Sequence, residues 1–153
     1  MSKIIKFSTE QMKKIVPSFS VEGYSHAPEY LWKSLGGLLY IPATKLTESF
    51  LEKHIIRADE DMKSVCFDLE DSVLPEEKSK ALEQLCAGLD FLDRYIKEKG
   101  TQVNRLPYIF VRLDTANAFS YYNRIMQSAF TSRNEFLGFV LPKFCPYTGM
   151  GYS

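Results

Sequence analysis

The hydrophobic pattern of the chain alternates between short apolar runs and longer segments with helical periodicity. The runs lie at residues 37–41, 64–69, 108–113 and 138–141. Each is bounded by turn residues or by charged groups, which is typical of a strand covered on both faces. These four runs therefore predict four buried strands.

The segments between the runs are predicted to be helices. Thr44 or Thr47 is placed to cap the first, whose apolar face has Phe50, Leu51, Ile55 and Ala58. The second begins at Pro75 and ends near Gly100, with leucines at three- and four-residue steps. The third is marked by Phe119, Tyr122, Met126 and Phe130.

The alternation of strand and helix predicts an α/β protein built of parallel βαβ units with right-handed crossovers. The pattern fits either an open doubly wound sheet or part of a barrel. No G-x-G-x-x-G and no G-x-x-x-x-G-K-[ST] follows a strand, which argues against dinucleotide-binding and P-loop folds. Residues 1–35 are interpreted as a helical lead-in, and residues 36–153 as one domain.

Composition narrows the class of protein. The 153 residues carry 19 basic and 19 acidic side chains, so charge gives no reason to expect a nucleic-acid partner. Three widely spaced cysteines, Cys66, Cys86 and Cys145, fit neither a disulfide framework nor a zinc motif. We see no signal peptide or membrane span, and we expect a cytoplasmic protein without membrane contact.

Charged side chains gather where the predicted strands end. Asp68, Glu70 and Asp71 lie at the end of the second strand, and Arg112 and Asp114 lie at the end of the third. The carboxyl ends of parallel strands are where ligands bind in α/β proteins. Carboxylate oxygens suit Mg²⁺, and a guanidinium fork can grip a substrate carboxylate with two hydrogen bonds. Together these groups suggest C–C bond cleavage in a small 2-oxo acid or an acyl thioester.

Simpler interpretations of the same residues stay open. Asp71, or Glu70, is also placed to cap the helix that begins near Pro75, and Arg112 is also a candidate structural partner for Asp68 or Glu70. Outside this cluster we interpret the remaining candidates, Lys45, Lys143, His54 and His26, as surface, rim or loop residues.

Four segments together resemble a known superfamily. They are G-G-L-L-Y-I-P-A-T (36–44), V-C-F-D-L-E-D-S-V (65–73), Y-I-F-V-R-L (108–113) and G-F-V-L-P-K-F (138–144). In order and spacing they resemble the HpcH/HpaI aldolase and citrate lyase β-subunit superfamily. The form of the first and fourth segments is most similar to the citrate-lyase-like proteins of bacterial tellurite-resistance-type gene clusters.

The resemblance implies a Mg²⁺-dependent (β/α)₈ TIM barrel that acts on C–C bonds of 3-hydroxy acids or their CoA thioesters. It implies that Arg112 binds the carboxylate and carbonyl end of the substrate, with Glu70 as the other catalytic residue. Glu70 and Asp71 would lie beside the metal and contact it through water. The direct metal ligands, a Glu and an Asp, would come from strands beyond residue 153.

A (β/α)₈ barrel has eight strands, and four are found in this sequence. We therefore expect the N-terminal half of a barrel, with about four βα units, that is inactive alone and belongs to a homo-oligomer when intact. The alternative is a non-catalytic binding or assembly module of a stress-response gene cluster.

Overall fold

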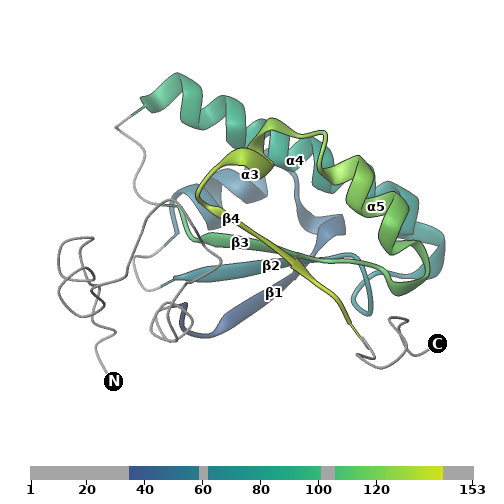
Figure 1. Cartoon of the computed structure of the whole chain (residues 1–153). Helices are drawn as coiled ribbons and strands as arrows, with labels where there is room; N and C mark the ends of the chain where they lie inside the picture. The colour runs from purple at the N-terminus through teal and green to yellow at the C-terminus, as the bar shows by residue number, and fades with distance from the viewer. Residues whose placement is uncertain (1–34, 59–61, 101–105, 143–153) are drawn as a thin grey trace, which may run out of the picture.

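The computed structural model of the protein describes residues 35–58, 62–100 and 106–142. Its centre is a parallel sheet in the order β1-β2-β3-β4 (Figure 1). The strands are β1 (Leu38–Pro42), β2 (Ser64–Asp68), β3 (Tyr108–Arg112) and β4 (Phe136–Val140). The four predicted strands are confirmed, although β4 begins two residues earlier than expected because Phe136 and Leu137 join it.

The α-helices of the described residues pack on the same face of the sheet (Figure 1). These are α3 (Glu48–Leu51), α4 (Lys78–Lys99) and α5 (Ala118–Ile125). A doubly wound sheet reverses its strand order and carries helices on both faces. Sequential strand order with helices on one face is the arrangement of a (β/α)₈ barrel wall. The structure thus decides between the two architectures that the sequence left open.

The connection after β1 is tightly turned. A 3₁₀ turn (Ala43–Lys45) leads to Thr47, whose hydroxyl accepts a hydrogen bond of 3.2 Å from the Phe50 N–H. Thr47 is therefore the N-cap, one of the two candidates. After α3 the helix continues as a π-helical segment (Glu52–Ile56). Leu51 and Ile55 are buried, as their spacing predicts.

Helix α4 is the main support of the sheet. It follows a 3₁₀ turn (Pro75–Glu77) and ends at Gly100, whose φ of 56° suits glycine. Its apolar stripe is buried against the sheet, as expected: Leu82, Leu85, Leu89 and Leu92. Gly88 lies where α4 approaches the first connection, since a Cβ there would stand 3.1 Å from Leu51 Cδ1.

Helix α5 differs from the expectation. It ends at Ile125, and a separate 3₁₀ turn (Ala129–Ser132) carries the buried Phe130. Within α5 the buried residues are Tyr121 and Ile125, while Phe119 is 80% exposed. The predicted third helix is therefore confirmed, but it is shorter than expected, since Met126 and Phe130 lie beyond its end.

The two faces of the sheet have different surroundings. Val65, Phe67, Ile109 and Val111 belong to the large core under the helices. The alternate side chains point to the other face, where Cys66 and Phe110 pack with Leu35 in a smaller cluster. This second face corresponds to the interior of a barrel. Side chains two residues apart in a strand point to the same face, so Asp68 lies on the face of Cys66, and Arg112 lies on the face of Phe110.

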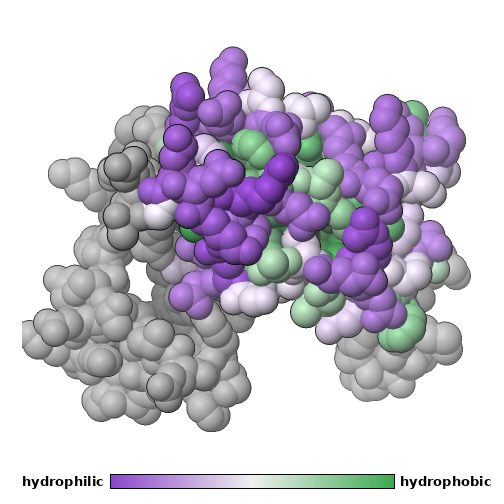
Figure 2. All heavy atoms as spheres, turned by 90° about the horizontal axis from the view of Figure 1, so that it is seen from above, coloured by the Kyte–Doolittle hydropathy of each residue, from purple (hydrophilic) through white to green (hydrophobic). Residues whose placement is uncertain are grey.

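The outer surface is mostly hydrophilic on the helix side, with apolar residues between the helices (Figure 2). Among the described residues, none of the helices has the length and apolar character to cross a bilayer.

Candidate functional site

The candidate site lies at the carboxyl ends of β2 and β3. The register pairs Asp68 directly with Arg112, and the Leu69 N–H donates to the Arg112 carbonyl at 3.0 Å. This pairing carries the chain past the end of β2 while keeping it beside β3. The segment 68–72 therefore faces Arg112, as the acidic strand end predicted.

Asp68 shapes the turn that carries the other acids. Its Oδ1 accepts a hydrogen bond of 2.8 Å from the Glu70 N–H, and its Oδ2 accepts one of 3.3 Å from the Ser72 N–H. An aspartate that binds backbone N–H groups two and four residues ahead fixes a turn locally. Asp68 is 2% exposed, so it acts as an internal support.

Arg112 contacts three carboxylates. Its Nη2 donates to Glu70 Oε2 and, at 2.5 Å, to Asp71 Oδ2, while Nη1 lies 3.5 Å from Asp68 Oδ2. Burial lowers the pKa of Arg112, but the hydrogen bond to Asp71 and the three negative charges outweigh it, so the pKa is raised. The guanidinium thus stays charged, and the structure brings together all the residues that the sequence proposed for the site.

The three partners of Arg112 differ in exposure. The side chain of Glu70 is 6% exposed, whereas that of Asp71 is 61% exposed. Glu70 also lies within 3.4 Å of the Thr115 hydroxyl. Glu70 is therefore a buried partner of the guanidinium. Asp71 is largely hydrated already, so its carboxylate can leave the guanidinium at a small cost in free energy.

Tyr40 of β1 borders the guanidinium from the neighbouring strand. The Arg112 Cζ lies 5.7 Å from the centre of the Tyr40 ring, a cation–π distance. Burial raises the pKa of the Tyr40 hydroxyl, helped by the nearby Cys66 and opposed by Arg112. Burial raises the pKa of the Cys66 thiol on the neighbouring strand β2 to about 12, and the negative charge of Asp68 also raises it. Cys66 is thus an inert, buried thiol, as the sequence suggested.

Hydrogen bonds of Lys78 join the loop after β2 to the loop after β3. Lys78 Nζ donates to the carbonyls of Leu69 and Glu70, each at 2.7 Å, and to Asp114 Oδ1 at 2.8 Å. Burial raises the pKa of Asp114, but hydrogen bonds from Lys78 and Asn117 outweigh it, so the pKa is lowered. The sequence drew attention to Asp114 as a strand-end group, but it gave no reason to select Lys78 or Tyr40.

Several alternatives can now be decided. The turn before α4 has Leu74 as its N-cap residue, without a side-chain cap, so neither Glu70 nor Asp71 occupies the N-cap position. The structural interpretation of Arg112 is confirmed, since it pairs with Asp68 and Glu70. Lys45 and His54 are exposed, as expected. The remaining candidates, His26, Lys143 and Cys145, lie outside the described residues, as does the lead-in up to residue 34.

The resemblance implies a Mg²⁺ ion, and it places the carboxylates of Glu70 and Asp71 beside that ion. Glu70 and Asp71 are carboxylates of the type that receives hydrogen bonds from metal-bound water. Both are already paired with Arg112, and no group of three ligating side chains is placed to hold a metal among the described residues. The described residues therefore provide acceptors for metal-bound water but no set of direct ligands.

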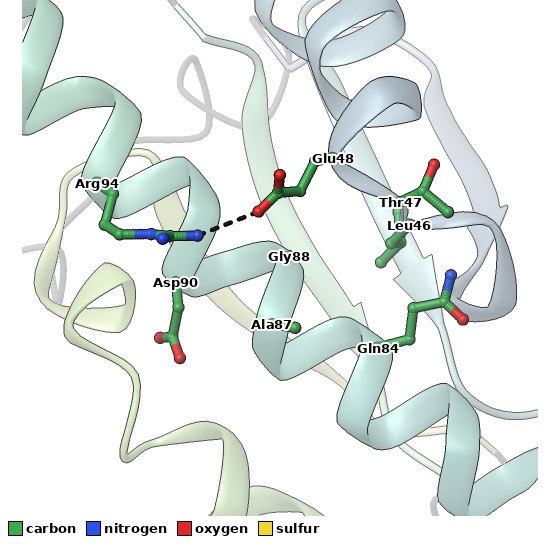
Figure 3. Close-up of a pocket in the computed structure, with 8 residues that line it drawn as sticks. All are labelled: Leu46, Thr47, Glu48, Gln84, Ala87, Gly88, Asp90 and Arg94. Atoms are coloured by element: carbon green, nitrogen blue, oxygen red, sulfur yellow. Dashed lines mark hydrogen bonds and ion pairs between the residues drawn. The ribbon is translucent and has the colours of Figure 1, made fainter.

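A separate groove lies in the helix layer between α4 and the chain that follows β1 (Figure 3). It has a volume of about 610 Å³. Arg94 and Glu48 form an ion pair of 3.1 Å across it. It is lined by none of the sequence-predicted site residues and lies on the opposite face of the sheet from Arg112, so it is not the candidate site.

The fold and the strand-end cluster define a segment of TIM-barrel wall with its chemistry at the carboxyl edge. Residues 29–153 match the sequence model of a protein family that is described as C–C bond lyases of the TIM-barrel fold. The chain therefore belongs to this C–C bond lyase family. No curated protein matches the chain.

Proposed function

We propose that this chain provides the substrate-binding wall of a Mg²⁺-dependent C–C lyase that acts on a small 2-oxo or 3-hydroxy acid or its CoA thioester. The observation that carries the proposal is the Arg112 guanidinium at the carboxyl end of β3, surrounded by Asp68, Glu70 and Asp71, in a chain of the C–C bond lyase family. Arg112 and Glu70 would be the catalytic residues.

Substrate would bind by exchange at the guanidinium. Asp71 is the exposed partner of Arg112, so an incoming carboxylate can displace it while Asp68 and Glu70 stay in place. A planar guanidinium that keeps two fixed acidic neighbours can orient a substrate carboxylate at its free edge. The Tyr40 ring closes one side of the guanidinium and limits the directions from which the ligand enters.

The displaced Asp71, together with Glu70, would accept hydrogen bonds from the water shell of Mg²⁺. When bound, the ion would polarise the substrate carbonyl and stabilise an enolate. The resemblance assigns its direct ligands, a Glu and an Asp, to later barrel strands. We therefore propose that turnover requires those strands and that residues 1–153 alone bind substrate without cleaving it. The finer assignment, to the citrate-lyase-like proteins of tellurite-resistance-type clusters, is part of this proposal.

The test is carboxylate binding at Arg112. The chain is titrated with pyruvate and malate, with and without Mg²⁺, while backbone and arginine side-chain NMR signals are followed. At least one probe should shift the Arg112 signals, and Arg112→Lys should weaken binding about tenfold or more because the two-bond fork is lost. Arg124→Lys, a change at an exposed surface pair, is the control. No binding, or equal binding by the Arg112 variant, would disprove the proposal.

A second candidate function is a non-catalytic assembly module. It is favoured by exposed apolar side chains: Leu39 on the edge strand β1, Phe119 and Tyr122 on α5, and Met126 directly after α5. Size-exclusion chromatography with light scattering separates the two ideas. A compact, defined homo-oligomer that binds no carboxylate probe supports the module. A species that binds a probe through Arg112 supports the lyase wall.

A further inference from the structure

We propose that Lys78 is a positioning residue of the candidate site, which holds the backbone around Glu70 so that its carboxylate faces Arg112. The inference rests on the proposed function, in which Arg112 binds the substrate carboxylate. Lys78 belongs to α4, and its hydrogen bonds go to the carbonyls of Leu69 and Glu70 and to Asp114 Oδ1. It would act on the site by holding these groups in place.

The first argument is the saturation of the ammonium group. Lysine has three N–H donors, and Lys78 Nζ has three acceptors within 2.8 Å: the Leu69 carbonyl, the Glu70 carbonyl and Asp114 Oδ1. The side chain is 16% exposed. A largely buried cation with every donor used has one preferred position, so it can define the position of its acceptors.

The second argument is the location of Lys78 in its helix. It is the first residue of α4, where the positive end of the helix dipole disfavours a cation by about 0.3–1 kcal/mol. Helix stability therefore gives no reason for a lysine at this position. The two carbonyls and Asp114 do give one, because they offset this cost with charge-assisted hydrogen bonds.

The third argument is the way in which Glu70 is held. Its N–H donates to Asp68 Oδ1 at 2.8 Å, and its carbonyl accepts from Lys78 at 2.7 Å. The Glu70 carbonyl also accepts a hydrogen bond of 3.2 Å from the Val73 N–H, and the bond from Lys78 is the shorter of the two. Both backbone groups of Glu70 are therefore held. The direction of its side chain toward Arg112 follows from this backbone.

The fourth argument is that Lys78 also reaches the loop after β3. Asp114 lies two residues beyond Arg112, and its other oxygen, Oδ2, accepts a hydrogen bond of 2.8 Å from Asn117. Lys78 thus joins the loop that carries Glu70 to the loop that follows Arg112. It adds to the hydrogen bonds of Asp68 and of the Leu69 N–H, which also fix the position of Glu70 relative to Arg112.

The experiment compares Lys78→Met with two controls in the full chain. Lys80→Met removes an exposed lysine from the same helix turn. Arg133→Met breaks the ion pair of 2.7 Å with Asp93 near the opposite ends of the strands, so it reports loss of stability without a local change. The readouts are hydrogen exchange of the Glu70 amide, the NMR signals of the Arg112 guanidinium and the affinity for pyruvate.

In Lys78→Met we expect exchange at Glu70 to accelerate about tenfold or more, with changed Arg112 signals, because charge-assisted hydrogen bonds are lost. Neither control should do this at matched stability. Asp114→Asn should move the same signals in the same direction, and it carries the test if Lys78→Met does not fold. The inference is overturned if Lys78→Met and Arg133→Met have equal effects on Glu70 and Arg112. If no probe binds the unmodified chain, the proposed function fails, whereas the exchange and guanidinium signals still decide the role of Lys78.

Discussion

Arg112 lies directly opposite Asp68 in the register of β2 and β3, and it provides a counter-charge for an aspartate that is 2% exposed. The same guanidinium is paired with Glu70, which is also buried. A buried carboxylate without a counter-charge is costly. The residue proposed to bind substrate is therefore also a structural element of the site, and its two roles need separate measurements.

Replacing Arg112 by Met should lower the free energy of unfolding by about 3–5 kcal/mol at neutral pH, because two buried carboxylates lose their partner. Arg112→Lys keeps the charge and should cost less. Urea unfolding followed by circular dichroism measures both. Arg124→Met, which removes an exposed pair with Glu83, should change stability by less than about 1 kcal/mol. Equal losses in the Arg112 and Arg124 methionine variants would contradict this assignment.

The carboxylate of Asp93 should contribute to the loss of folding stability at low pH. Hydrogen bonds from Lys97 (2.6 Å) and then Arg133 (2.7 Å) lower its pKa below the ordinary value of 3.8, although burial opposes them. A lowered pKa means that the stabilisation is complete above the unfolded-state pKa and is lost as the pH falls through the folded-state pKa. Asp93→Asn should therefore be destabilising at pH 7, with a difference that shrinks below about pH 4.

Urea midpoints between pH 7 and pH 2 test this prediction. Glu98→Gln is the matched control, since Glu98 is an exposed carboxylate in the same helix without a side-chain partner among the described residues. The control should stay within about 0.5 kcal/mol of the unmodified chain at pH 7. A difference between Asp93→Asn and the unmodified chain that grows toward low pH would be the wrong sign and would reject the assignment.

The strands and α4 could be predicted from the sequence because their signals are local. Continuous apolar runs bounded by turns predict the strands, and leucines at three- and four-residue steps predict α4. The alternation of strands and helices alone did not decide between an open sheet and a barrel, because strand order depends on which edge each crossover returns to. The resemblance implied the barrel, and the sequential strand order confirms a segment of barrel wall. For the site, clustered acids at one strand end and an arginine at the next were enough, since parallel strands bring their carboxyl ends together. Lys78 and Asp114 are 36 residues apart, and no local pattern joins them.

The true buried face of α5 provides a direct check of the structure against the sequence pattern. Ile125 is fully buried and Phe119 is 80% exposed. Ile125→Ala should cost about 2–5 kcal/mol because it leaves a cavity under the helix. Phe119→Ala removes a larger side chain but should cost less than about 0.5 kcal/mol, because water already surrounds that side chain. Chemical denaturation of the two variants distinguishes them, and the reverse order would contradict the packing of α5 through Ile125.

Gly88 should be the position where α4 tolerates the least added volume. A Cβ there would stand 3.1 Å from Leu51 Cδ1 and 3.6 Å from Leu46 Cβ. Gly88→Ala gains up to about 1 kcal/mol of helix propensity, which offsets the close contact, so it should be nearly neutral. Gly88→Val places two further methyl groups on this Cβ and should cost about 1–3 kcal/mol in unfolding free energy, because it overpacks the contact.

Ala87→Val is the control, at the exposed neighbouring position. It should cost only the difference in helix propensity, less than about 1 kcal/mol. Thermal and urea unfolding of the three variants measure the contact, and a Gly88→Val as stable as Ala87→Val would show that α4 does not pack tightly against the first connection.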